Sequence, residues 1–147
     1  MIDNLKVKGK LHIVLTDEFG NLKHEDTVDN LVVTAGLGFI ASRMAGTSSA
    51  VMSHMAIGTG TVAAAAGNTT LGTEVNRQAL GSTTHSAATV VYVATFNPGA
   101  GTGAITEAGI LNNSSGGTLL CRTIFAVVNK AAGDTLTINW TVTVAAA

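Results

Sequence analysis

Apolar and polar residues alternate in the first part of the chain. From residue 5 to residue 15 the odd positions are apolar or glycine, and lysine or histidine fills positions 6, 8, 10 and 12. A period of two predicts a strand with one buried and one exposed face. Residues 17–21 (DEFGN) have turn chemistry, and residues 22–33 are expected to return as the second strand of a hairpin.

One short helix is expected after this hairpin. Thr34 is a candidate N-cap for a helix over residues 35–45, and Gly46 follows its end. Gly36 and Gly38 lower its helix propensity, so it must be stabilised by packing against a sheet.

The rest of the chain is predicted to consist of strands and loops. In residues 135–144 Leu, Ile, Trp and Val alternate with Thr and Asn, so one face is core and the other is a threonine ladder. Loops rich in Gly, Ala, Thr and Asn separate the segments. The expected strands cover residues 51–58, 75–80, 83–96, 104–111, 118–128 and 135–144.

Short strands at this spacing predict an all-β fold, a two-sheet antiparallel β-sandwich of jelly-roll type with an N-terminal β-hairpin. The chain of 147 residues is expected to form a single domain. Its expected parts are a charged hairpin or arm over residues 1–33, the short helix over 34–46, and sandwich strands over 51–147.

The charge distribution limits the classes of partner that the protein is expected to bind. Charged residues are 12% of the chain, against about 25% in soluble domains, and the net charge is −1. No basic cluster is present to attract nucleic acid and no apolar run is long enough to span a membrane, so neither partner is expected. Ten of the seventeen charged side chains lie in residues 1–30. The remaining neutral, threonine-rich surface favours burial against further copies of the chain; the alternative is a monomer whose threonine faces contact water.

The few charges in the rest of the chain are candidates for a structural ion-pair network. An unpaired charge in a strand is costly to bury, so Glu107 is expected to pair with Arg77 or Arg122. The alternative is that these charges lie on the solvated rim. The candidate network consists of Glu74, Arg77, Glu107 and Arg122.

Motifs for catalysis or cofactor binding are weak. Residues 36–41 (GLGFIA) imitate a dinucleotide fingerprint, but no Asp or Glu occurs between Asp29 and Glu74 to bind a ribose. Residues 58–61 (GTGT) lack the lysine of a phosphate loop and are interpreted as a turn. The four histidines are scattered, and the single cysteine, Cys121, is expected to be structural. No catalytic residue, metal or cofactor is therefore predicted.

Several short fragments between about residues 30 and 144, taken together in their order along the chain, resemble small virion proteins of tailed bacteriophages. The residues 105–110 (ITEAGI) also resemble a stretch of phage tail-fibre and baseplate proteins. The fragments are 57–60 (IGTG), 71–74 (LGTE) with Arg77, 103–110 (GAITEAGI), 117–120 (GTLL) with Arg122 and Phe125, 129–130 (NK), and 133–140 (GDTLTINW).

The resemblance implies a non-enzymatic virion protein, assembled in the bacterial cytoplasm. It would be a homotrimer that decorates or cements the capsid by binding the major capsid protein or another virion protein. The alternative is a tail, collar or baseplate component; an enzyme, a small-ligand carrier and a carbohydrate-binding sandwich have less support. The charged hairpin is the expected contact with the shell or a neighbouring subunit, through Lys6, Lys8, Lys10 and Lys23.

Overall fold

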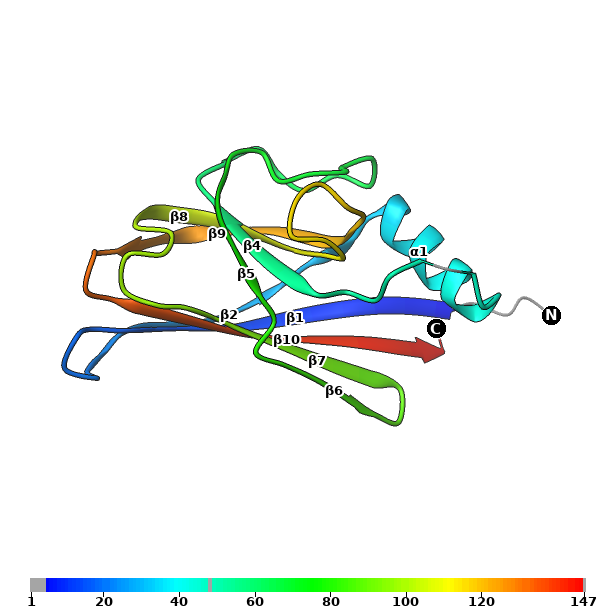
Figure 1. Ribbon diagram of the computed structural model, residues 1–147, viewed down its shortest axis with the longest axis horizontal. Coiled ribbons are helices and arrows are strands. Elements are labelled where there is room, and N and C mark those ends of the chain that lie inside the picture. The colour runs from blue at the N-terminus through cyan, green and yellow to red at the C-terminus, as the bar shows by residue number, and fades with distance from the viewer. Residues whose placement is uncertain (1–4, 48, 147) are drawn as a thin grey trace.

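The computed structural model describes residues 5–47 and 49–146, which form two antiparallel five-stranded sheets and one helix (Figure 1). The all-β sandwich predicted from the sequence is confirmed. Residues 1–4, 48 and 147, which belong to the expected N-terminal hairpin, the loop after the helix and the C-terminus, lie outside the described residues.

Sheet A has the strand order β2-β1-β10-β7-β6. Sheet B has the order β3-β9-β8-β4-β5. In chain order the strands are β1 (Leu5–Thr16), β2 (Leu22–Asp29), β3 (Leu31–Val32), β4 (His54–Gly58), β5 (Glu74–Ala79), β6 (Ser82–Ser86), β7 (Thr89–Phe96), β8 (Gly103–Leu111), β9 (Leu119–Lys130) and β10 (Thr135–Ala146).

The strands β1 and β10 form the middle of sheet A. They pair along their whole length, with Leu11 opposite Trp140 and Ile13 opposite Ile138. These four side chains are fully buried, because the inward positions of both strands face sheet B. The alternation predicted for residues 5–15 and 135–144 is thereby confirmed, and the charged hairpin is part of the sandwich, not an arm attached to it.

The helix α1 (Thr34–Met44) lies at one end of the sandwich and packs against β9 (Figure 1). The predicted capping by Thr34 is wrong: Val33 is the N-cap, makes no side-chain cap bond, and leaves Thr34 as the first helical residue. Gly36 is buried, and a Cβ at this position would overlap the backbone carbonyl of Leu120. The glycine in the dinucleotide-like motif therefore allows the helix to approach the sheet closely.

Apart from the connection through α1, which joins β3 and β4 of sheet B, the connections alternate between hairpins within a sheet and crossings between sheets. Each of the pairs β1–β2, β4–β5, β6–β7 and β8–β9 is a hairpin in one sheet. Strands that lie far apart in sequence are also neighbours, because β10 lies between β1 and β7 in sheet A and β8 lies between β9 and β4 in sheet B.

Two strand predictions were too long. Residues 83–96 form two strands, because the chain turns at Ala87, which has a φ of 50°. Residues 22–33 also divide: β2 stays in sheet A, and β3 crosses to pair with β9 through Leu31 and Arg122. Strand propensity alone shows neither a turn made of alanines nor a change of sheet.

Candidate functional site: the outer face of sheet A and the buried Glu107 cluster

The outer face of sheet A carries the predicted threonine ladder. Thr137, Asn139, Thr141 and Thr143 of β10 point away from the core and are half-buried. Across the register, Lys8 lies opposite Thr143, Lys10 opposite Thr141 and His12 opposite Asn139. A column of two lysines and a histidine therefore runs beside a column of small polar side chains.

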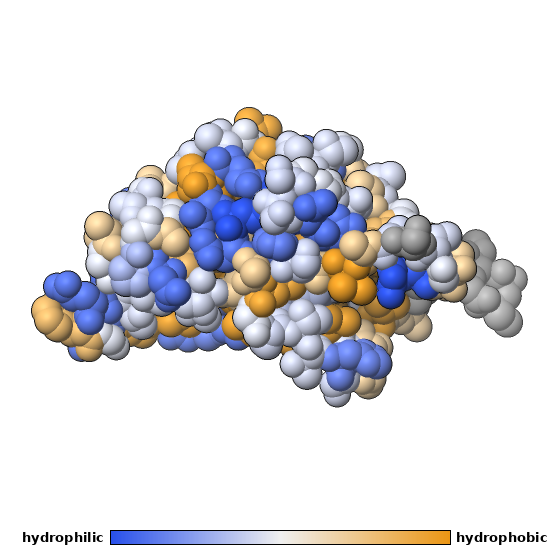
Figure 2. Space-filling model, viewed as in Figure 1, coloured by the Kyte–Doolittle hydropathy of each residue, from blue (hydrophilic) through white to orange (hydrophobic). Residues whose placement is uncertain are grey.

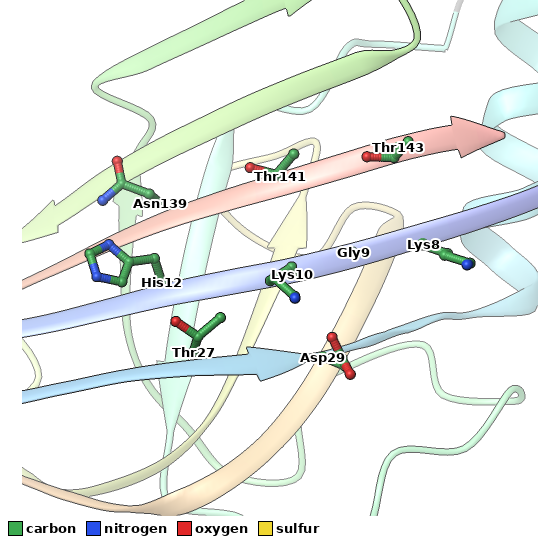
Figure 3. Close-up of a pocket in the computed structure, with 9 residues that line it drawn as sticks. All are labelled: Lys8, Gly9, Lys10, His12, Thr27, Asp29, Asn139, Thr141 and Thr143. Carbon is green, nitrogen blue, oxygen red and sulfur yellow. The ribbon is translucent and has the colours of Figure 1, made fainter.

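These columns line a shallow hollow of about 360 Å³ (Figure 3). Lys8, Lys10 and His12 come from β1, and Asn139, Thr141 and Thr143 come from β10; Thr27 and Asp29 of β2 complete the rim. The hollow is open and lies over three strands of one rigid sheet, so it is suited to contact with another surface more than to enclosure of a small molecule.

The lysines on this face have different surroundings. Lys6, Lys8 and Lys10 are exposed and make no salt bridge with the other described residues. His12 Nε2 lies 2.8 Å from Glu25 Oε1 of β2. Three of the four predicted contact lysines thus share one exposed strand face and are available to a partner.

Lys23, the fourth predicted contact lysine, is engaged elsewhere. Its Nζ donates a hydrogen bond of 2.6 Å to Oδ2 of Asp134, a buried carboxylate that also accepts the N–H of Ala131 at 2.7 Å. The bond from Lys23 and the Ala131 N–H hold the pKa of Asp134 below its usual value. Lys23 therefore connects β2 to the β9–β10 turn and, unlike the other three lysines, has a salt-bridge partner among the described residues.

Glu107 of β8 is a fully buried carboxylate that binds a long loop. Its Oε2 accepts the N–H groups of Gly60 at 2.5 Å and Thr73 at 2.8 Å, and its Oε1 accepts that of Gly72 at 2.7 Å. Both ends of the loop over residues 59–73, between β4 and β5, are thus attached to one side chain. Residue 60 must be glycine, because a Cβ there would overlap Glu107 Oε2.

Arg122 of β9 is the ionic partner of Glu107. The two lie on a diagonal across the strands, because Glu107 of β8 is opposite Ile124 and Arg122 of β9 is opposite Gly109. Nε of Arg122 is 3.2 Å from Oε1 of Glu107. Arg122 also donates to Oδ1 of Asn68 at 3.0 Å and to the carbonyl of Val62 at 2.9 Å, so it holds the middle of the same loop. Arg122 is one of the two partners predicted for Glu107.

The pKa of Glu107 results from opposing effects. Burial raises it, because a charged carboxylate loses its hydration. The N–H groups of Thr73, Gly72 and Gly60, together with Arg122, outweigh burial and hold the pKa below its ordinary value. Glu107 is therefore ionised at neutral pH and is neutralised by its own surroundings, which makes it a structural anchor.

The remaining two members of the predicted network form a separate pair. Arg77 Nη2 lies 2.6 Å from Oε1 of Glu74 on β5. Its Nη1 donates to the carbonyls of Asn113 and Gly116 at 2.9 and 2.8 Å and so holds the β8–β9 loop. The four residues thus form two separate ion pairs, each attached to a different loop, and no hydrogen bond or salt bridge among the described residues joins the two pairs.

Two further kinds of site, a metal centre and a reactive thiol, lack the side-chain surroundings they need in the described residues. No group of three or more His, Cys, Asp and Glu side chains in residues 5–47 and 49–146 is placed to hold a metal ion. Cys121 is buried in the core, and burial raises the pKa of its thiol. Nor does the described part contain a helix long and apolar enough to cross a bilayer.

Sequence reasoning missed a second hollow, at the end of the sandwich beside α1. It has a volume of about 840 Å³. Phe39 and Ile40 of α1 form one wall, and Val90, Tyr92 and Val142 on the inner face of sheet A form the other. Hydrophobic surface lies between α1 and the projecting β6–β7 hairpin in Figure 2. The walls come from segments about 50 residues apart or more, so no local pattern marks this hollow.

No family model, no curated protein and no solved structure matches the chain.

Proposed function

We propose that the protein is a non-enzymatic structural protein of a tailed-bacteriophage virion, a decoration or cement protein that binds the capsid shell and stabilises it. The observation that carries the proposal is the outer face of sheet A, where three lysines that make no salt bridge with the described residues run beside a threonine ladder. The resemblance of residues 30–144 to small virion proteins is the reason for placing the protein on a phage particle.

The chemistry of this face suits a lasting protein contact. Threonine hydroxyls lose little hydration energy when they meet another polar surface, and they can hydrogen-bond across it. The column of Lys6, Lys8 and Lys10 complements an acidic surface on the major capsid protein or another virion protein. The anchored loops keep the sandwich rigid, so little conformational entropy is lost on attachment.

Particles purified from cells that produce the phage encoding this chain provide the test. A decoration protein is expected in hundreds of copies per particle, and immunogold labelling should follow the head. If gel densitometry of intact, nuclease-treated particles shows no band for the chain, the proposal fails.

The contact face is tested by charge reversal. The double substitution Lys8→Glu and Lys10→Glu should remove the protein from particles, because it places carboxylates against an acidic partner. Arg43→Glu on α1 reverses the charge of one exposed side chain on another surface and should leave occupancy unchanged. Equal occupancy for the two variants would exclude the outer face of sheet A as the contact.

A tail, collar or baseplate component is the second candidate, and residues 105–110 favour it through their resemblance to tail-fibre and baseplate proteins. In this chain the segment forms most of β8 and contains Glu107. A handful of copies per particle, with label at the tail, would favour this location over the head.

Self-association is the remaining part of the proposal. The expected homotrimer would scatter light with three times the mass of the chain. A strict monomer at high concentration would restrict assembly to a pre-formed shell.

A further inference from the structure

Two sheets have four edges, and three of them are protected against further pairing. The edge strand β2 carries charges, including Glu25 and Asp26, and its pairing with β1 has a register irregularity. The edge strand β5 has the Glu74–Arg77 pair and an irregular register with β4. At the third edge the two-residue strand β3 pairs only with Cys121 and Arg122 of β9, and β9 itself has an irregular register with β8. Charges, irregular registers and short length all keep edge strands from pairing with other chains.

The fourth edge, β6, has none of these devices. Its sequence Ser-Thr-Thr-His-Ser contains no Lys, Arg, Asp, Glu or Pro, and all five residues are exposed. It pairs with β7 in an unbroken register from Ser82–Val93 to Ser86–Thr89. The strand projects at the margin of sheet A, with no described strand on its outer side (Figure 1). Its outer backbone groups are therefore free to bond with another strand.

The composition of β6 makes a second copy of the same strand a suitable partner. An antiparallel pair centred on Thr84 would place Thr84 opposite Thr84 of the second copy and Ser82 opposite Ser86. Facing threonines are a favourable cross-strand pair, and no like charges meet. Pairing β2 with itself would instead bring carboxylates together. The net charge of −1 gives little repulsion between whole molecules.

The apolar hollow beside α1 adds to this surface. His85 of β6 lines it, together with Val90 and Tyr92 of β7, so its floor is the inner face of sheet A. A strand from a second copy, added at β6, extends that floor. The hollows of the two copies then lie on one continuous sheet. Met44, at the end of α1 and 81% exposed, borders the same hollow.

We propose that β6 is a self-association edge, through which two copies of this chain pair antiparallel about a two-fold axis to form one continuous ten-stranded sheet. This goes beyond the proposed function, because it holds in solution without a particle. The contact joins two copies and does not itself build a trimer; within a trimeric assembly it would link one trimer to the next.

Site-directed cross-linking tests the position of the contact. Cys121 is fully buried, so Thr84→Cys introduces the one accessible thiol in the described residues. A short bis-maleimide should convert this variant to a covalent dimer at concentrations where light scattering shows association. The matched control is Thr102→Cys, an exposed threonine in the loop between β7 and β8, which should remain uncross-linked. Equal cross-linking of both variants, or none of Thr84→Cys, would overturn the proposal.

A charge placed on β6 tests how much this edge contributes to dimerisation. Thr84→Lys puts two ammonium groups opposite each other and should weaken dimerisation by about tenfold or more in sedimentation equilibrium. Thr102→Lys, at an exposed position in the loop between β7 and β8, should leave the dimerisation constant unchanged. The emission of the single, buried Trp140 checks that both variants fold. Unchanged association of Thr84→Lys, or a wild-type protein that stays monomeric at all concentrations, would contradict the self-association edge.

Discussion

Glu107 carries a full charge at a position with no exposed surface, and it is stable there because every lone-pair direction is used. Three backbone N–H groups and one guanidinium replace the water that the carboxylate loses. The residue therefore couples β8, β9 and the loop over residues 59–73. Removing its charge should weaken the attachment of these three segments to one another.

Glu107→Gln should lower the free energy of unfolding at pH 7 by about 3 kcal/mol or more, because Arg122 is left buried without its counter-charge and an amide N–H₂ faces backbone donors. Denaturant unfolding followed by Trp140 emission measures the change. Glu18→Gln, at an exposed position in the β1–β2 turn, is the control and should have little effect. A variant as stable as the wild type would show that the cluster does not anchor the loop.

The pH dependence of stability follows from the same residue. Because the folded-state pKa of Glu107 lies below its ordinary value of 4.5, the ionised carboxylate stabilises the fold above about pH 4.5, and this contribution is lost as the pH falls through the lower, folded-state pKa. Asp17 and Asp134 have lowered pKa values and act in the same direction. The wild type should therefore lose more stability between pH 5 and pH 3 than Glu107→Gln does. Equal losses of stability in the wild type and in Glu107→Gln between pH 5 and pH 3 would contradict the assignment of this pH dependence to Glu107.

Cys121 should be inert while the protein is folded. Its side chain is fully buried and burial raises its pKa, so the reactive thiolate is neither formed nor reached. Ellman's reagent should give no reaction with the native protein and one thiol per chain in guanidinium. Rapid reaction under native conditions would indicate frequent opening between the sheets.

Among the elements, α1 depends most on tertiary packing. It has two internal glycines, no side-chain N-cap and no acidic residue in its first turn, so its intrinsic stability is low. The two glycines, however, differ in their surroundings. Gly36 lies against the backbone of β9, and Gly38 faces open space.

Gly36→Ala should destabilise the protein by about 2 kcal/mol, because the added methyl group meets the immobile carbonyl of Leu120 and displaces the helix. Gly38→Ala makes the same chemical change two residues away, where nothing lies within 4 Å, and should stabilise by up to about 1 kcal/mol. Thermal unfolding of the two variants gives the comparison. Equal shifts would mean that α1 is not held closely against β9.

At the scale of the whole molecule, the charged N-terminal segment serves two purposes. The inward side chains Leu11, Ile13 and Leu15 belong to the core, whereas Lys6, Lys8 and Lys10 lie on the opposite, exposed face of the same strand. Because β1 lies between β2 and β10, no part of this hairpin can be removed as a separate attachment arm.

Deletion of residues 1–30 should therefore abolish folding and would not isolate an attachment function. Without β1, one side of Trp140 and Ile138 is uncovered and β10 becomes an open edge. Circular dichroism and Trp140 emission should show an unfolded or aggregated chain, whereas the variant with Lys8→Glu and Lys10→Glu should keep the native spectra. Cooperative unfolding of the deleted chain would contradict this view of β1.

The sequence by itself determined the elements whose signal is local. The alternation in residues 5–15 and 135–144 decides which side chains enter the core, because a strand places neighbouring residues on opposite faces. The scarcity of charge predicted a partner for Glu107, since a lone buried charge is too costly. Tertiary structure alone decided that the partner is Arg122, that Lys23 binds Asp134, and that backbone N–H groups of a distant loop surround Glu107. The identity of the free edge at β6 was decided in the same way, because strand order and backbone donors leave no trace in side-chain patterning.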